Sequence, residues 1–397
     1  MRMIKSIRKM AVALAVLLLA VSLGGCAENL PDMAPSSYES RVLQAWSTMM
    51  LTEADRMNDT LVLYNAIYDI QTGELIRGYC EDPECDGECY LERGYCFMHS
   101  LVGDRMYFSV FVPQEDMYYF CYREISTGSV QLLFTLPEEE RGAFESACVD
   151  GKYYYYYSNM QLKEGGNPDL LSDYLSYISR YDMESGTHEV VYECRSGMDI
   201  LYYVIDGILY TAYQGGFWRT DLATMQQTLL IDHGALGYRE GFVSLRYLDG
   251  YFYEIAIPAN GGGRQLLRFD AVSGEHAVLV DEPVATYALT NDAIYFFPQQ
   301  PMRPIGEPVR GEGGEEEYEY IGSDTIYTCN HDGSGVRPVW TDESGLIDLI
   351  GVAFTVFEDI YYGDIRIFDL ETNAFGERFF AEIHFDTGEI IRAIEVE

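Results

Sequence analysis

One hairpin pattern occurs seven times along this chain of 397 residues, and this repetition restricts the possible folds more than any other feature. Each copy has an apolar or aromatic strand, a polar turn with Asp, Glu or Asn near its start, and a second apolar strand. Asp or Asn can accept a hydrogen bond from the backbone two residues on, and a late Gly supplies the positive φ of a short loop. The copies span residues 67–76, 122–133, 179–191, 218–230, 267–280, 327–340 and 383–394, and Met225 breaks the glycine pattern in the fourth.

The spacing of the copies predicts a repeat architecture. The acidic or Asn position falls at Asp69, Glu124, Asp182, Asp221, Asp270, Asn330 and Asp386, so the intervals are 55, 58, 39, 49, 60 and 56 residues. Most copies follow a second strand pair, such as the aromatic-rich segments 150–158 and 249–257, which makes four strands per interval. Four-stranded units at this spacing are typical of the blades of a β-propeller.

We therefore predict an all-β fold, a β-propeller with seven four-stranded blades, with six or eight blades as alternatives. The propeller would occupy residues 41–397 as a single domain. The C-terminal hairpin ends flush with the chain, and we expect it to close the ring.

The N-terminal segment has the features of a secretory signal. Arg2, Lys5, Arg8 and Lys9 precede an apolar run, residues 11–23, that is too short to cross a bilayer comfortably. The run ends in Leu23-Gly24-Gly25-Cys26, which resembles the lipobox of bacterial lipoproteins. That resemblance implies a signal peptide at residues 1–25 and a diacylglycerol and palmitate anchor on Cys26. Residues 26–40 would form a polar tether.

The charge balance excludes one class of partner. The chain has 64 acidic and 26 basic residues, and the signal segment holds four of the basic ones, so the mature charge is 22 − 64 = −42. A protein this acidic lacks the basic footprint of nonspecific nucleic-acid binding. The charge would keep a large β-protein solvated and would attract cationic partners.

Two sets of residues repeat with the blades and favour a structural interpretation over a binding site. The chain has 34 tyrosines, and the run Tyr153–Tyr157 would place alternate rings on opposite faces of a sheet. Packing between blades explains these rings better than an aromatic carbohydrate platform does. Arg180, Arg219 and Arg268 each lie two residues before a turn Asp, which favours bonds between blades.

The nine cysteines fall into distinct groups. Cys80, Cys85, Cys89 and Cys96 lie close together, and their spacing lacks a C-x2-C pair, so we favour disulfides over a zinc site, with free thiols as a third alternative. Cys121, Cys148, Cys194 and Cys329 lie in strand-like segments and are expected to be buried as small apolar side chains.

These features together resemble surface lipoproteins of Gram-positive gut bacteria. Those proteins carry a β-propeller of unknown function that is similar to the Tol-system and LDL-receptor-like propellers. The segment "CEDPEC", Cys80 to Cys85, matches a "C-x-D-P-x-C" pattern of the family, although the His that often follows is absent here. The resemblance implies an extracytoplasmic location and no established activity.

The sequence contains no G-x-S-x-G, H-E-x-x-H or P-loop motif, so the main prediction is non-enzymatic binding or scaffolding. The partner would be a peptide, protein or glycan at the cell envelope. The alternatives are a glycan-cleaving enzyme with carboxylates in the central channel, or an envelope-assembly scaffold. The protein is expected to be monomeric and to need no cofactor; Asn330 to Gly335 resembles the start of a calcium loop only weakly, and we interpret it as a turn.

Residues 298–322 interrupt the repeat pattern between two strands of the sixth blade. This insertion is rich in Pro, Gly and Glu, and long loops without structure are usually functional or disordered. We expect it to lie on the loop-bearing face of the ring and to bind a cationic or calcium-bridged partner. The candidate ligand-binding residues are Glu315, Glu316, Glu317, Tyr318 and Tyr320.

Overall fold

A computed structural model provides the three-dimensional description of the chain. It describes residues 43–44, 54–57, 60–63, 66–69, 75–77, 89–102, 105–124, 127, 129–137, 147–167, 173–195, 199–310, 316–357, 359–376 and 379–395. Within these residues the structure is almost entirely β-strand, with one short helix, α2 (Tyr90–Arg93). The all-β prediction is therefore confirmed.

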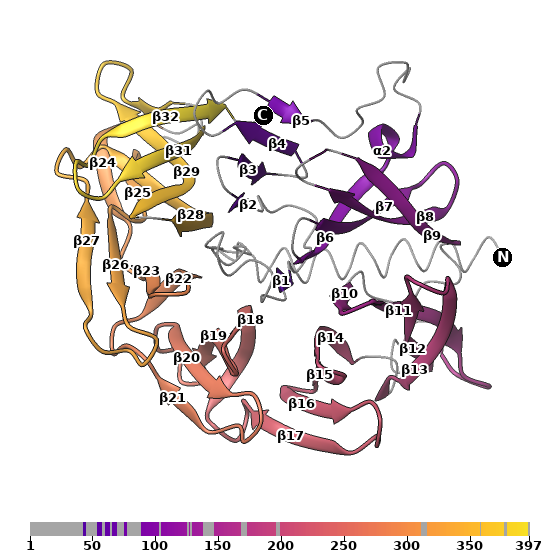
Figure 1. Cartoon of the computed structure of the whole chain (residues 1–397). Helices are drawn as coiled ribbons and strands as arrows, with labels where there is room; N and C mark the ends of the chain where they lie inside the picture. The colour runs from indigo at the N-terminus through magenta and orange to yellow at the C-terminus, as the bar shows by residue number, and fades with distance from the viewer. Residues whose placement is uncertain are drawn as a thin grey trace.

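The described residues contain seven sheets of four or five strands, and the four main strands of each follow one another in chain order (Figure 1). The first sheet consists of β2 (Ala54–Met57), β3 (Thr60–Leu63), β4 (Ala66–Asp69) and β5 (Leu75–Arg77). The second consists of β6 (Tyr95–Val102), β7 (Arg105–Val112), β8 (Met117–Glu124) and β9 (Val130–Pro137), with β1 (Leu43–Gln44) paired to β6. The third consists of β10 (Ala147–Asp150), β11 (Tyr153–Leu162), β12 (Tyr174–Asp182) and β13 (Thr187–Glu193).

The remaining sheets repeat this plan. The fourth consists of β14 (Ile200–Ile205), β15 (Ile208–Tyr213), β16 (Gly216–Asp221) and β17 (Gln227–Asp232). The fifth consists of β18 (Tyr238–Leu248), β19 (Tyr251–Pro258), β20 (Gln265–Asp270) and β21 (His276–Val278). The sixth consists of β22 (Val284–Leu289), β23 (Ile294–Pro298), β26 (Thr325–Cys329) and β27 (Arg337–Thr341). The seventh consists of β28 (Ile347–Phe357), β29 (Ile360–Asp369), β31 (Phe379–His384) and β32 (Ile390–Glu395), and β30 (Ala374–Phe375) pairs with β29.

The sheets are arranged as a β-propeller. Figure 1 shows them around a ring with their first strands toward the centre, and β6 contacts β10, β10 contacts β14, β18 contacts β22, and β22 contacts β28. The predicted fold is confirmed. The number of blades stays a prediction, because the side chains of β1 to β5 lie outside the described residues.

Each of the seven repeated hairpins forms the third and fourth main strands of its sheet, as expected for hairpins that follow another strand pair. The C-terminal hairpin is predicted to close the ring, and the contact that the structure shows there is a different one. The C-terminal hairpin β31–β32 forms the outer half of the seventh sheet, and it is the central strand β28 that contacts β2. The four main strands of each sheet follow one another along the chain, and only β1 joins a sheet, the second, from a position before the first. The first and seventh sheets meet through their inner strands β2 and β28.

The hairpin turns have the predicted chemistry. Oδ1 of Asp182 accepts hydrogen bonds from the backbone N–H groups of Glu184 and Ser185, and Oδ1 of Asp270 accepts them from Val272 and Ser273. The late glycine of the turn has positive φ, for example +74° at Gly274. Met225 occupies the same position of the fourth turn with φ of +59°, which is strained for a side chain with a Cβ.

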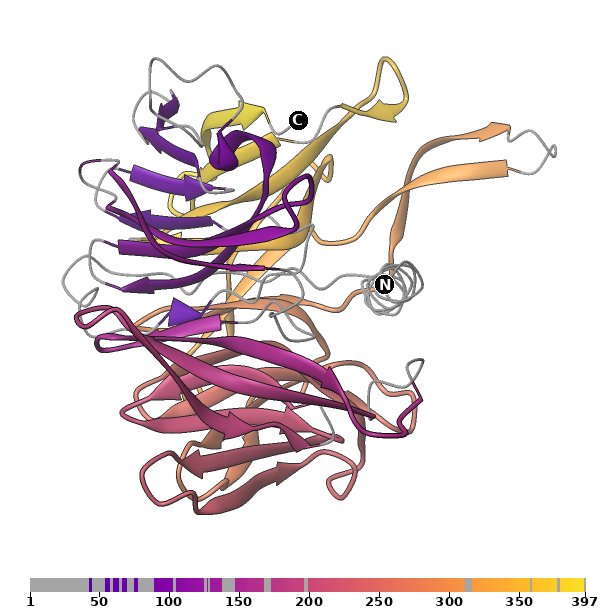
Figure 2. The same cartoon turned by 90° about the vertical axis from the view of Figure 1, so that its right-hand side faces the viewer.

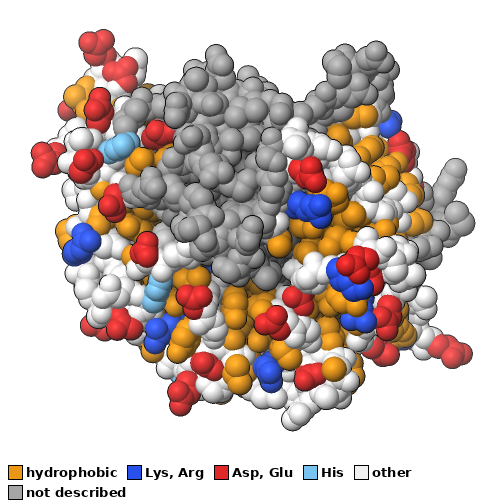
Figure 3. All heavy atoms as spheres, in the orientation of Figure 1, with side chains coloured by type: hydrophobic (Ala, Val, Ile, Leu, Met, Phe, Trp, Pro, Cys, Tyr) orange, Lys and Arg blue, Asp and Glu red, His pale blue; other side chains and the backbone are white. Residues whose placement is uncertain are grey.

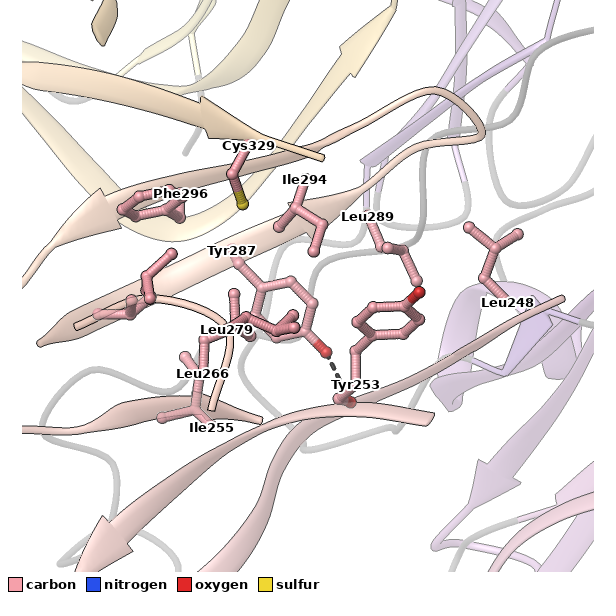
Figure 4. Close-up of a cluster of buried hydrophobic side chains, with 12 residues drawn as sticks. Leu248, Tyr253, Ile255, Leu266, Leu279, Tyr287, Leu289, Ile294, Phe296 and Cys329 are labelled. Atoms are coloured by element: carbon pink, nitrogen blue, oxygen red, sulfur yellow. Dashed lines mark hydrogen bonds between the residues drawn. The ribbon is translucent and has the colours of Figure 1, made fainter. Parts of the chain in front are cut away.

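Tyrosines fill the spaces between sheets. Tyr154 and Tyr156 pack toward the second sheet, whereas Tyr155 and Tyr157 pack toward the fourth, which confirms the predicted alternation of this run. Figure 4 shows the hydroxyl of Tyr287 in the sixth sheet donating to the carbonyl oxygen of Tyr253 in the fifth, at 2.7 Å. Packing is thus the role of these buried rings.

Two of the three repeated arginines, Arg180 and Arg268, have different partners. Nη1 of Arg268 donates to the carbonyl oxygen of His331 in the next sheet, at 2.8 Å, which is the expected bond between blades. Arg180 instead binds Glu189 on the neighbouring strand and stacks on the ring of Tyr153. For Arg180 the prediction of a bond between blades is therefore wrong, because its own hairpin supplies a carboxylate within reach.

The predicted signal peptide, the tether and Cys26 lie outside the described residues, so these assignments stay predictions. No helix in the described part of the chain combines the length and the apolar character needed to cross a membrane.

Candidate functional site

The topology assigns the loops to two faces of the ring. In a four-stranded meander, the link between the second and third strands lies at the same end as the link to the next blade. The short turns after the first and third strands lie at the other end. The 298–322 insertion joins the second and third strands of the sixth sheet, so it belongs to the face that carries the links between blades.

The insertion is an ordered β-hairpin over its described residues, and the prediction of a loop without structure is wrong there. β24 (Arg303–Arg310) pairs with β25 (Glu316–Ile321) in a separate two-stranded sheet. Figure 2 shows these two strands, in orange, extending beyond the body of the propeller. We call residues 303–321 the arm. Alternation of Glu and Tyr in "EEYEYI" supports a strand, which was a signal available in the sequence.

A small apolar cluster anchors the arm to the seventh sheet. Ile305 of β24 and Ile321 of β25 are buried against Phe368 of β29, with Leu346 and Phe375 packed beside them. An isolated two-stranded hairpin is marginally stable in water. Contact with the seventh sheet therefore supplies the burial that the hairpin needs.

Polar contacts fix the same docking geometry. The side-chain amide of Asn373 binds the backbone of Glu307 twice: Nδ2 donates to the carbonyl oxygen at 2.8 Å, and Oδ1 accepts from the N–H at 2.7 Å. Nη2 of Arg366 donates to the carbonyl oxygen of Tyr320 at 3.1 Å, while its Nε lies 2.8 Å from Oδ2 of Asp348. These bonds hold both strands of the arm at its base.

Gly306 makes this close approach possible. Its φ is +73°, and a Cβ at this position would lie 2.4 Å from both Oδ1 of Asn373 and Cζ of Phe368. The strand register shifts between Ile305 and Val309, so Gly306 sits in a bulge that turns the arm toward the seventh sheet.

The two faces of the arm differ in character. Ile305 and Ile321 share the docking face. Pro304 pairs with Tyr320, and Tyr318 lies two residues away, so these three residues share the outward face. Tyr318 and Tyr320 are 38% and 40% exposed, and Met302 at the base of the arm is 68% exposed. Exposed aromatic residues on an ordered strand are typical of protein interfaces.

The arm is also acidic. Residues 299–322 contain six glutamates and two arginines, so their formal charge is 2 − 6 = −4. Figure 3 shows the face opposite the arm, where acidic side chains are spread around the rim among apolar ones. The arm therefore combines exposed tyrosines with a local excess of negative charge.

The other predicted site residues divide as follows. Tyr318 and Tyr320 lie on the outward face, whereas Glu315 lies outside the described residues. Glu316 and Glu317 belong to β25, with side chains outside the described set. The structure thus brings the two tyrosines together and leaves the glutamate triplet a prediction.

Cys89 has a free thiol in the structure. Cys80 and Cys85 lie outside the described residues, as does the side chain of Cys96, so the disulfide or metal assignment for these four stays a prediction. Cys121, Cys148, Cys194 and Cys329 are buried free cysteines, as expected. Burial raises the pKa of the Cys121 thiol to about 12, which keeps it protonated and unreactive.

The weak calcium-loop resemblance at Asn330 to Gly335 corresponds to a turn. The backbone N–H of Gly333 donates to the carbonyl oxygen of Asn330, and Oδ1 of Asp332 accepts from Ser334. The described residues contain no group of three or more His, Cys, Asp or Glu side chains arranged to hold a metal ion.

Four carboxylates that are buried in the described residues were not identified from the sequence: Asp199, Glu254, Asp342 and Asp348. Asp199 binds Arg195, Asp348 binds Arg366, and Glu254 binds His233. The side chains of these three acids are 0–6% exposed. These three carboxylates have a basic partner in the protein itself, and Oδ2 of Asp342 accepts hydrogen bonds from the backbone N–H groups of Leu346 and Ile347. The partners of these buried carboxylates belong to the folded core, whereas glycan cleavage requires two accessible carboxyl groups.

Comparison with known proteins gives structural neighbours only. No protein family and no curated protein matches the sequence. One solved structure, from an analysis of two prolyl endopeptidases, covers 99% of this chain at 13% identity with a TM-score of 0.46; this chain spans about half of it, 54%. The propeller domain of the trilobed protease from Pyrococcus furiosus matches at 12% identity and a TM-score of 0.44. The match covers 92% of this chain and 99% of that domain. TolB from Acinetobacter baumannii matches at 12% identity and a TM-score of 0.36. The match covers 82% of this chain and 78% of TolB.

Proposed function

We propose that this chain is a membrane-anchored, extracytoplasmic β-propeller lipoprotein that binds a protein or peptide partner through its arm, without catalysing a reaction. The observation that carries this proposal is the outward face of the arm, where Tyr318 and Tyr320 are exposed on a hairpin that is docked at its base. Anchoring by acylated Cys26 rests on the N-terminal sequence.

The docking of the arm supports a binding role. A tyrosine on a docked hairpin has already lost much of its freedom, so a partner orders fewer groups when it binds. Tyr also contributes a large contact area with only two side-chain torsions and a polar hydroxyl group. The arm thus offers the kind of preorganised aromatic surface on which binding energy concentrates.

The charge of the arm indicates the chemistry of the partner. Acidic groups next to exposed tyrosines favour a segment rich in Lys or Arg, because the cations can pair with carboxylates and stack on aromatic rings. Association should then be sensitive to ionic strength, since rim charges are screened within about 10 Å at 0.1 M salt.

The experiment is a binding screen with the chain from Asp32 onward against cationic and neutral peptides, envelope proteins and glycans. A double variant, Tyr318→Ser with Tyr320→Ser, removes the outward rings and leaves the docking residues Ile305 and Ile321 unchanged. A matched control, Leu132→Ser with Val190→Ser, removes two other exposed apolar side chains from outer strands. We expect the parent and the control to bind a cationic peptide or protein and the tyrosine variant to bind at least tenfold more weakly.

Unchanged binding by the tyrosine variant would refute the arm as the site. Selective binding of a neutral glycan would favour the carbohydrate alternative, and turnover of any compound in the screen would refute the non-enzymatic role.

A further inference from the structure

Two arginines of this protein hold carboxylates in the same way. Nε and Nη2 of Arg180 lie 3.1 and 2.8 Å from Oε2 of Glu189. Arg195 uses the same two nitrogen atoms toward Asp199, with Nε 2.9 Å from Oδ1. The N–H groups on this edge of a guanidinium point in parallel, which matches the two oxygen atoms of a carboxylate.

Arg246 presents the same edge without an acid. It lies on β18, the central strand of the fifth sheet, and is 1% exposed. Its Nε and Nη2 are both closed to solvent, and within the described part of the protein neither has a hydrogen-bond partner. Arg246 therefore contrasts with Arg180 and Arg195, although it is more deeply buried than either.

The surroundings of Arg246 explain why no side chain of its own sheet neutralises it. Arg246 pairs in register with Tyr253 on β19, so the side chains of these two residues share one face of the sheet. Glu254 is the next residue on β19, and its side chain therefore projects from the opposite face. There Oε1 of Glu254 lies 2.5 Å from Nε2 of His233. On the side of Arg246 lie Tyr253 and the neighbouring Tyr287, whose hydroxyl donates to a backbone carbonyl (Figure 4).

A buried charge without a partner is strongly unfavourable, and buried polar groups in native proteins are almost always bonded. The absence of a partner is the more unusual because this chain has 64 acidic and only 26 basic residues. A protein with such an excess of carboxylates has every opportunity to place one beside a buried arginine. An acid supplied from outside the protein accounts for the arrangement.

We propose that Arg246 binds the carboxylate of a small organic acid through its Nε–H and Nη2–H groups, at the central end of the interface between the fifth and sixth sheets. We expect a small acid, because Nε and Nη2 of Arg246 are closed to solvent and the side chain lies beside Tyr253 and Tyr287. The site is separate from the arm and would operate whether or not the arm binds a protein.

The test is thermal unfolding of the full chain in sodium acetate, sodium succinate, triglycine or triglycinamide, each compared with sodium chloride at equal ionic strength. Acetate and succinate represent free acids. Triglycine carries the C-terminal carboxylate of a peptide, and triglycinamide lacks this carboxylate. The carboxylate that binds should raise the melting temperature in a saturable way. At about 100 times its dissociation constant it should increase the folding equilibrium constant roughly 100-fold.

Arg246→Met removes the charge and keeps most of the volume, and Arg246→Lys keeps the charge without the parallel N–H pair. We expect no carboxylate-specific shift in the Met variant, at least tenfold weaker binding in the Lys variant, and a normal response in a control Arg180→Met. In sodium chloride alone, the Met variant should be at least as stable as the parent, because it lacks the buried unpaired charge.

Three results would overturn the proposal. The first is the absence of any carboxylate shift beyond that of chloride, and the second is an equal shift in Arg246→Met. The third is a Met variant that unfolds well below the parent in chloride alone, which would indicate that the protein itself supplies the partner of Arg246.

Discussion

Nε2 of His233 lies 2.5 Å from Oε1 of Glu254, and both side chains are buried, at 2% and 0% exposure. The histidine begins the link between the fourth and fifth sheets, directly after β17, and the glutamate lies on β19. Nδ1 of His233 also binds the carbonyl oxygen of Gly215, and the ring of Tyr238 and the carboxylate of Asp232 lie nearby. Burial alone would lower the pKa of His233, but its bond with Glu254 raises that pKa above the usual 6.5.

This pair should make stability depend on pH. A histidine whose pKa is raised by folding contributes stability that is complete below its unfolded pKa and is lost as pH rises through the folded value. Glu254→Gln should therefore lower the free energy of unfolding more at pH 6 than at pH 9, as measured by urea denaturation. Asp199→Asn is the control, because its partner Arg195 stays charged throughout. An equal loss for Glu254→Gln at both pH values would contradict the assignment.

The glycine of the repeated turn also sets the distance between blades. A Cβ on Gly274 would lie 2.2 Å from the carbonyl oxygen of Leu230 in the preceding sheet, whereas a Cβ on Gly186 would meet nothing closer than 3.8 Å. Both glycines have similar φ, +74° and +69°. We expect Gly186→Ala to cost about 1–2 kcal/mol from the backbone alone and Gly274→Ala about 2–5 kcal/mol. If chemical denaturation showed equal losses in the free energy of unfolding for the two variants, the close approach of Gly274 to Leu230 would not be important.

Met225 offers the opposite change. It holds φ of +59° in the position that glycine occupies in related turns, and its side chain is 48% exposed. Met225→Gly should therefore raise the free energy of unfolding by about 0.5–1 kcal/mol, after allowance for the greater freedom of glycine in the unfolded chain. A lower free energy of unfolding for Met225→Gly in urea would count against a strained turn at this position.

The lipid anchor is tested by Cys26→Ala. Acyl chains on this residue would hold the mature protein at a membrane, so the variant should appear in the soluble fraction or persist as an unprocessed precursor. Cell fractionation with a blot that separates precursor from mature protein measures this. A variant that is cleaved normally and remains with the membrane would exclude acylation of Cys26 as the anchor.

The fold could be predicted because its information is local and repeated. Each turn residue, such as Asp182 or Asp270, bonds within a few residues of itself, and the alternation of Tyr154 and Tyr155 is fixed by the pleat of one strand. Seven similar local signals at a regular spacing lead to the propeller.

The docking of the arm could not be predicted because it depends on contacts between distant residues. Gly306 and Asn373 are far apart in sequence, and only the assembled ring brings the amide of Asn373 to the backbone beside Gly306. The pair His233–Glu254 and the isolated position of Arg246 have the same origin, since neighbouring strands decide which buried groups meet. In a chain with 64 acidic residues, no spacing rule distinguishes Glu254 from the others.

The most direct test of the account is photo-crosslinking in cells that carry a benzoylphenylalanine residue at position 318, 320 or 190. Tyr318 and Tyr320 lie on the outward face of the arm, and Val190 is a control that is 51% exposed on an outer strand. If the arm is the binding surface, irradiation should give a discrete adduct with one envelope protein from positions 318 and 320 and none from position 190. The same adduct from position 190, or an adduct from position 190 alone, would contradict the arm as the site of partner binding.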